Sequence, residues 1–292
     1  MKKIALTVFA LSVASFTTAE EVNRKLDADP EGTVSVYNTS GSIEIVGWGR
    51  REVEVTGTIG DDVDEFIFER SGKVTTIKVK TPSRHGRVDV TSNLVIRVPQ
   101  KSSIDVATVS ADIEVEGVRG EQELQAVSGD IQSEVFGSDI RANTVSGDLD
   151  IEAEGEGQSK LVSVSGDITA RGIGGEVDAE VVSGDIDIRG GGFDEVKAES
   201  VNGDIEWSGT LREGGRLDME TVNGSIDIAF VGSVDARFDI ETFNGRIKNC
   251  FGPKPERTSK YAPGWELSFT EGDGSGRVTI ATLNGSLDLC KE

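Results

Sequence analysis

Apolar and polar side chains alternate in steps of two along most of this chain. In one stretch Val177 and Ala179 are apolar, and Ile186 and Ile188 are apolar again after a Ser-Gly-Asp sequence. Alternation by two is typical of a β-strand with one buried face. The parity changes just before Val182, which we expect to be buried with Ile186. A bend is therefore needed, and the Ser-Gly pair supplies its turn chemistry.

The same pattern recurs as Val-Ser-Gly-Asp-Ile, with Asn replacing Ser in later copies. The glycine position recurs every 18 to 21 residues, apart from a last step of 40 residues that we interpret as two coils. A fixed period near 20 residues indicates a solenoid. Copies begin at Val109, Val127, Val145, Val164, Val182, Val201, Val222, Phe243 and Leu283, with an outlying copy at Thr39.

Each copy predicts two short strands that meet at the turn. Stacking such units about 4.8 Å apart produces parallel sheets. We therefore predict an all-β fold, a single-stranded parallel β-helix that is right-handed, with coils of about 18–21 residues. An antiparallel meander or a propeller is the alternative. The short step argues against a propeller, whose blades need about 40 residues.

The regular repeats do not extend over the whole chain. We predict a signal peptide over residues 1–19, an N-terminal cap with irregular first coils over 20–105, and regular β-helix repeats with a C-terminal cap over 106–292. The stretch around Gly41 keeps the repeat register, so we expect it to form the first coil. Glu65–Glu69 and Val74–Lys80 are expected to form a hairpin. A cap is needed because an open end exposes unpaired backbone groups.

The first residues are typical of an export signal. Lys2 and Lys3 precede an apolar run, and small residues lead up to Ala19. We predict a Sec signal peptide cut after Ala19, and hence a periplasmic or extracellular protein of a Gram-negative-like bacterium. A membrane anchor is the alternative, but the run is shorter than the roughly 20 residues that span a bilayer. No later segment is apolar enough to be transmembrane.

Charge and composition exclude several classes of function. The chain has 30 Lys and Arg residues against 52 Asp and Glu residues, a net charge of -22. Such a surface repels nucleic acid and anionic lipid. The chain has 1 His, His85, so a zinc site built from several His cannot form. We expect no cofactor.

The repeated Val-Ser-Gly-Asp-Ile sequence, together with Gly41–Trp48 and Leu94–Pro99, resembles the bacterial adhesin-like family of β-strand repeats (the DUF4097 type). The resemblance covers nearly all of the chain after the signal peptide. It implies a β-helix protein of the cell envelope, but it provides no functional residues.

We therefore predict a non-enzymatic envelope protein with an adhesin-like recognition role or a structural role, acting through an extended acidic sheet face. The partner would be an envelope protein or polysaccharide. A carbohydrate-active β-helix enzyme, a lyase or hydrolase, is one alternative, which clustered carboxylates and Arg/Lys in a cleft would favour. A periplasmic envelope-stress or assembly partner is another.

An aspartate follows the glycine in most copies, so the repeats predict a column of stacked carboxylates. The simplest interpretation is a solvated acidic face that blocks aggregation. Weak binding of divalent cations such as calcium, between stacked carboxylates, is the alternative. The residues concerned are Asp130, Asp148, Asp167, Asp185 and Asp204.

Basic residues gather in one part of the N-terminal region. They either alternate outward on a strand or form a docking patch for an acidic partner. A solvated loop is the simplest interpretation of His85, which lies beside them. The candidate patch consists of Lys73, Lys78, Lys80, Arg84 and Arg87.

The 2 cysteines follow equivalent asparagines by the same interval. Cys250 lies six residues after Asn244, and Cys290 lies six residues after Asn284. Equivalent positions on stacked coils come close enough for a disulfide. Because export leads to an oxidising compartment, we predict a Cys250–Cys290 bond that clamps the C-terminal end.

Overall fold

The computed structural model describes residues 20–82, 89–259 and 263–291, and these residues form an all-β structure without helices. The signal-peptide prediction for residues 1–19 lies outside the described residues. The strands are β1 (Glu20–Asp27), β2 (Thr33–Trp48), β3 (Glu52–Ile59), β4 (Glu65–Ser71), β5 (Val74–Lys80), β6 (Thr91–Pro99), β7 (Ser103–Glu116), β8 (Gln122–Ser128), β9 (Ile131–Val135), β10 (Ile140–Ser146), β11 (Leu149–Ala153), β12 (Gly157–Ser165), β13 (Ile168–Ser183), β14 (Ile186–Asn202), β15 (Ile205–Asn223), β16 (Ile226–Phe230), β17 (Ala236–Asn244), β18 (Ile247–Asn249), β19 (Glu256–Arg257), β20 (Trp265–Glu271), β21 (Gly276–Asn284) and β22 (Leu287–Lys291).

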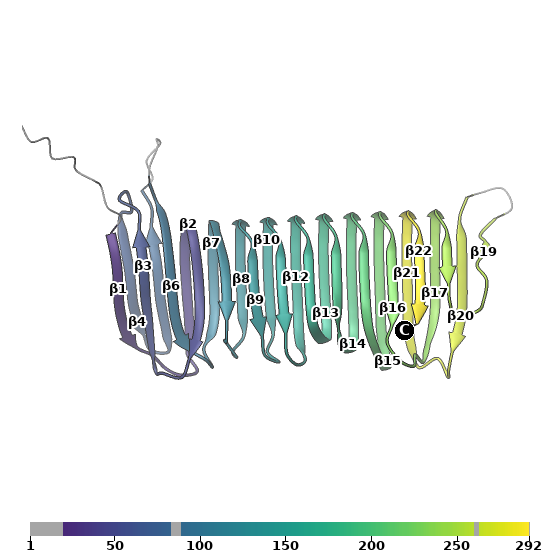
Figure 1. Cartoon of the computed structure of the whole chain (residues 1–292), viewed down its shortest axis with the longest axis horizontal. Coiled ribbons are helices and arrows are strands. Elements are labelled where there is room, and N and C mark those ends of the chain that lie inside the picture. The colour runs from purple at the N-terminus through teal and green to yellow at the C-terminus, as the bar shows by residue number, and fades with distance from the viewer. Residues whose placement is uncertain (1–19, 83–88, 260–262, 292) are drawn as a thin grey trace, which may run out of the picture.

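The central part of the molecule is a stack of repeat units, which we call rungs. A rung is a strand before the turn, the turn itself and a strand after it, such as β10 and β11. Strands before the turn pair in parallel with each other, as β8, β10 and β12 do, and form the first wall. Strands after the turn, such as β9 and β11, form the second wall. Figure 1 shows the rungs side by side along the long axis.

The core lies between the two walls and consists of columns of like residues. Ile186 pairs with Ile168 on one neighbouring rung and with Ile205 on the other, and all three are almost fully buried. Towards the C-terminal end the column contains aromatic rings. The rings of Trp207 and Phe230 lie 5.1 Å apart in an edge-to-face contact, a geometry that aromatic pairs favour.

The position of the parity change differs from our expectation. Val182 was expected to be buried, but 45% of it is exposed, whereas the residue three before the glycine is buried in each repeat. That residue is usually Thr or Ser, and its hydroxyl is satisfied inside the stack. Thr221 Oγ1, for example, donates to the carbonyl oxygen of Gly203 on the neighbouring rung at 3.1 Å. The bend therefore follows Val182. In most rungs the residue three before the glycine is a Thr or Ser that points inward, because a backbone carbonyl on a neighbouring rung accepts its hydroxyl.

The C-terminal rung is inserted out of chain order. β21 pairs in parallel with β15 on one side and with β17 on the other, and β22 lies likewise between β16 and β18. The step of 40 residues is therefore one rung in space, and our expectation of two coils is wrong. The intervening chain instead forms β19 and β20, and β20 pairs antiparallel with β17 at the end of the stack. Figure 1 shows β20 and β19 outside β17.

The predicted disulfide is present in this arrangement. Asn244 and Asn284 are direct neighbours in register, so the cysteines six residues later also lie on adjacent rungs. The Cα atoms of Cys250 and Cys290 are 4.9 Å apart and the two sulfurs are bonded. The bond joins the inserted C-terminal rung to the last parallel rung.

The N-terminal end shows the same insertion. β2 contains Gly41 and pairs in parallel with β5 and β6 on one side and with β7 on the other. It therefore precedes β5, β6 and β7 in the chain, but it lies between them in the stack. Antiparallel strands cover this end, with β4 on β5 and β3 on β6, and the predicted hairpin of β4 and β5 is confirmed. These end strands, together with the inserted rungs, mean that successive coils in the chain are not always neighbours in space.

Candidate functional site

The exposed apolar residues are concentrated in one line along the first wall. The residue two before the glycine is apolar in successive rungs and stands outward beside the turn. Its exposed fraction is 42–49% in each of these rungs except that of Val222, which is half-buried. An exposed apolar strip that extends over successive rungs is the kind of surface that can bind a partner. We call this line the apolar ridge; in spatial order it consists of Val109, Val127, Val145, Val164, Val182, Val201, Val222, Leu283 and Phe243.

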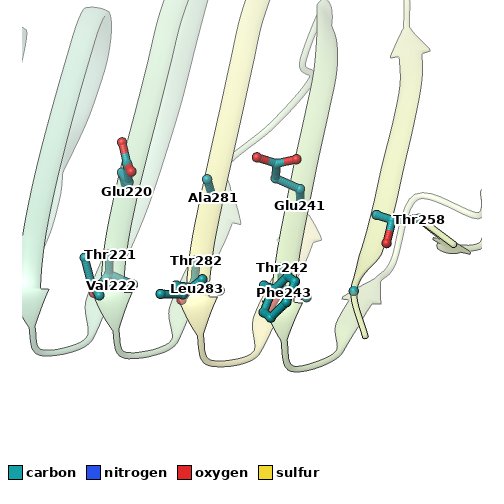
Figure 2. A pocket seen from close by; sticks show the side chains of 11 residues that line it. Glu220, Thr221, Val222, Glu241, Thr242, Phe243, Thr258, Ala281, Thr282 and Leu283 are labelled. Carbon is teal, nitrogen blue, oxygen red and sulfur yellow. The ribbon is translucent and has the colours of Figure 1, made fainter. Parts of the chain in front are cut away.

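A groove runs beside the apolar ridge on the same wall. Its middle part has a volume of about 370 Å³ and is lined by Val164, Val182 and Val201 together with the buried Ser163 and Ser200. A second part, of about 410 Å³, lies near the C-terminal end. Figure 2 shows this second part, in which Val222, Leu283 and Phe243 lie near the turns.

The far side of the groove is formed by the residues four before the glycine, which we call the flanking row. The row is uncharged in the N-terminal half of the stack and acidic in the C-terminal half. In Figure 2 Ala281 lies between Glu220 and Glu241, as the strand register also requires. In spatial order the row consists of Ala107, Gln125, Asn143, Val162, Glu180, Glu199, Glu220, Ala281 and Glu241.

Lysines neutralise the middle of the flanking row. The carboxylate of Glu180 lies 3.8 Å from Lys160 Nζ and 3.7 Å from Lys197 Nζ. Lys160 also donates to Asp178, and this hydrogen bond raises the pKa of Lys160. The hydrogen bond to Glu199 likewise raises the pKa of Lys197. Both lysines therefore stay charged at neutral pH, and the acidic character is left to the C-terminal rungs.

The predicted aspartate column is present, but its carboxylates have structural partners. The backbone N–H of Asp167 donates to Asp148 Oδ1 at 2.8 Å, and that of Asp185 donates to Asp167 Oδ1 at 2.8 Å. The same bond links Asp130 to the rungs on either side and Asp204 to Asp185. Each aspartate thus satisfies a turn N–H of the next rung. Among the described residues no group of three or more His, Cys, Asp or Glu residues could hold a metal ion. Cation binding stays a prediction.

The structure does not assemble the described lysines of the basic patch into one site. Lys73 lies 3.8 Å from Asp29, and Lys80 forms an ion pair with Glu65 at 2.6 Å. Lys78 is over the ring of Tyr37. Each cation therefore has its own local partner. Arg84, Arg87 and His85 lie outside the described residues.

The comparison with protein families identifies the chain's relatives. The profile described as Toastrack DUF4097 matches residues 69–289. The chain belongs to the Toastrack DUF4097 family. The family match thus covers both the regular repeats of this Toastrack protein and the hairpin strand that precedes them. The comparison with curated proteins found no match. In the described part of this family member no helix is long and apolar enough to cross a membrane.

Solved structures of low sequence identity resemble this Toastrack protein. A "putative adhesin" from Bacteroides fragilis is 14% identical, with 93% of this chain and 98% of that chain covered and a TM-score of 0.41. A "putative cell adhesion protein" from Clostridium sporogenes is 11% identical, with 94% and 100% covered and a TM-score of 0.25. A "putative lipid binding protein" from Parabacteroides distasonis is 11% identical, with 92% and 96% covered and a TM-score of 0.33.

Sequence reasoning missed the apolar ridge, although its residues were in view. Val182 and its equivalents were assigned to the core because apolar residues are usually buried. The overlooked signal was the Thr or Ser one position earlier. A column of small hydroxyl residues continues the inward alternation from positions such as Val177 and Ala179, which leaves the next residue pointing outward.

Proposed function

We propose that this protein is a non-enzymatic component of the cell envelope with a recognition or structural role, and that the apolar ridge with its groove is the contact surface. The single observation that carries the proposal is the line of exposed apolar side chains along the first wall. Burying such side chains contributes about 25 cal/mol for each Å² removed from water. A partner that covers the ridge would therefore gain a large hydrophobic contribution.

The handedness of the solenoid, the location of the protein and its mode of action are part of the same proposal. We infer a right-handed β-helix for the central rungs, a periplasmic or extracellular location, and an adhesin-like mode of action along the side of the rod. The family membership and the disulfide support an envelope location, because disulfides persist in oxidising compartments. The regular rungs, joined by parallel strand pairs, support a rigid rod that displays one surface over its whole length.

A polysaccharide-active enzyme is the second candidate. The observation in its favour is a groove of about 330 Å³ on the first wall, lined by Asp178 and Glu195 together with Arg141 and Lys160. A glycosidase needs one protonated acid and one ionised base. Here Lys160 donates to Asp178 at 2.8 Å, so a cation and a carboxylate lie side by side in this groove. Turnover of a polyuronate or of envelope glycan by the purified protein would favour this candidate.

Fractionation of cells tests the ridge as the contact surface. In the variant Val164→Ser/Val182→Ser/Val201→Ser, retention of the protein in the envelope fraction should fall at least several-fold. All three side chains are exposed, so the variant should fold normally. Val231→Ser is the matched control, because Val231 is 45% exposed, like Val182, but lies off the ridge. Equal retention of wild type and triple variant would rule out the ridge as the contact surface.

A further inference from the structure

We propose that the partner of the apolar ridge is a second copy of this chain, packed ridge against ridge with the two rods antiparallel. This inference rests on the proposed function, because it names the occupant of the same surface. It assigns the chain a two-fold symmetric dimer in which the central rung of one copy, which contains Glu180 and Val182, faces the same rung of the other.

The layout of the first wall supports a second copy as the occupant. The apolar ridge and the groove run side by side on one wall, and the strand register keeps them parallel over successive rungs. A two-fold axis that lies between two facing walls and runs along their strands reverses the order of the rungs but keeps the position along each strand. It therefore places the apolar ridge of one copy on that of the other, and each flanking row on the other flanking row. A surface that is complementary to itself is what a two-fold interface requires.

The charges of the flanking row favour antiparallel over parallel rods. If the rods were parallel, the acidic half of each flanking row would face the same acidic half, with Glu220 near Glu220 and Glu241 near Glu241. Like charges across a sheet contact are destabilising. In the antiparallel arrangement the acidic rungs face uncharged ones, so that Glu220 faces the rung of Asn143 and Glu241 faces the rung of Ala107.

The charges at the centre of the contact and of a nearby arginine are also compatible with the antiparallel arrangement. Glu180 is the one acidic residue of the row that would meet its own copy, and Lys160 and Lys197 already neutralise it. Arg141 lies exposed on the rung of Asn143 and forms no ion pair with a described residue. The antiparallel arrangement brings this cation to the rung of Glu220 of the second copy.

The area is sufficient for a stable dimer. With about 4.8 Å per rung, the ridge from Val109 to Phe243 is roughly 40 Å long. A contact of that length, and wide enough to include ridge, groove and flanking row, covers on the order of 700 Å² of each copy. Standard-size interfaces bury about 800 Å² for each partner. The turn residues next to the ridge are uncharged Ser and Asn, so the line along which the two ridges meet contains no charged side chain.

The test is the oligomeric state of the purified protein, measured by sedimentation equilibrium over a range of concentrations. Wild type should be dimeric at tens of micromolar. Val164→Ser/Val182→Ser/Val201→Ser should raise the dissociation constant at least tenfold, and Val231→Ser should leave it within twofold. A wild type that is monomeric up to several hundred micromolar would overturn the proposal, and so would a dimer that the triple variant does not weaken.

A charge placed in the uncharged half of the row distinguishes the two directions. Asn143→Lys should tighten the antiparallel dimer several-fold at low salt, because the new cation faces the rung of Glu220. The gain should disappear in the double variant Asn143→Lys/Glu220→Lys and in about 0.5 M salt. In a parallel dimer Asn143→Lys faces itself and weakens the contact, a result that would overturn the antiparallel arrangement.

The outcomes also separate this inference from the function on which it rests. If the protein is monomeric but the triple variant loses envelope retention, the ridge binds a different partner and the second copy is excluded. If the protein is an antiparallel dimer but retention is unchanged in the triple variant, the proposed envelope contact fails while the dimer stands.

Discussion

At the scale of single residues, the turn of each rung is defined by the neighbouring turn. A methyl group built on Gly166 would overlap the carbonyl oxygen of Gly147 on the next rung, and the φ of Gly166 is 147°. The buried hydroxyl of Ser163 donates to that same carbonyl at 3.3 Å. Glycine is therefore required by stacking as well as by backbone conformation.

This requirement predicts a large effect of one added methyl group. Gly166→Ala should lower the free energy of unfolding by about 1–3 kcal/mol, because the two turns must move apart or strain. Gly191→Ala is the control, since a methyl group there meets nothing within 4 Å. Urea denaturation of the two variants at low protein concentration measures the difference. Similar losses in both would show that the contact between turns is not the cause.

At the scale of elements, the two ends of the chain are each enclosed within the stack. β2 lies between β6 and β7, and β21 lies between β15 and β17. The last parallel rung can therefore be complete only after the C-terminal rung has inserted. The Cys250–Cys290 disulfide then joins β22 to the chain that follows β18. The antiparallel strands beyond cover edges that would otherwise invite pairing with other chains.

Removing the disulfide should loosen one end of the rod and not the middle. Cys250→Ser/Cys290→Ser opens a loop of sequence separation 40, which corresponds to roughly 3–4 kcal/mol of lost stabilisation. Hydrogen exchange should show reduced protection in β17, β18, β21 and β22 and unchanged protection in β10. A reductant should have no further effect on the variant. Uniform loss along the rod would contradict a local clamp.

At the scale of the whole molecule, electrostatic repulsion opposes the compact state. The net charge is -22, and the aspartate column places carboxylates on adjacent rungs. The column persists because each carboxylate also accepts a backbone N–H, as Asp148 does from Asp167. The asparagines at the later turns stack without this charge, with Asn223 donating to Asn202 at 2.9 Å.

Changing Asp148, Asp167 and Asp185 together to Asn should therefore raise the melting temperature at low salt by a few °C. The amide oxygen keeps the acceptor while the repulsion is removed, and added NaCl should remove the advantage. The matched triple change to Ala loses the acceptors and should lower the melting temperature at high salt, where repulsion is screened. Calorimetry at protein concentrations too low for the proposed dimer to form measures the melting temperatures of both triple variants. If the Asn variant is no more stable at low salt, repulsion in the column is negligible.

Melting temperatures measured with calcium test whether the aspartate column binds cations. Weak cation binding in the column would make millimolar calcium stabilise the wild type beyond NaCl of equal ionic strength. The Asn variant would lose that extra shift. A calcium shift that survives in the variant would place the cation elsewhere.

Much of the fold could be predicted from the sequence, because the repeat is local. The alternation of Ile186 and Ile188 and the glycine at each turn required strands that meet at a bend. The equal spacing of Cys250 and Cys290 from their asparagines predicted the disulfide. The candidate site was harder to predict, since the exposure of Val164 depends on whether the hydroxyl of its neighbour Ser163 finds an acceptor on the adjacent rung.

The sequence by itself determined the all-β class, the rung period, the resemblance to the DUF4097 type and the cysteine pair, because each follows from the position of residues within a repeat. Only the tertiary structure decided the order of the rungs and that the ridge residues point outward. The terminal rungs carry the same pattern as the others, so alternation cannot say where they insert. Stacking decides it, because a rung is stable wherever its columns, its hydroxyls and its turn amides find partners on both sides.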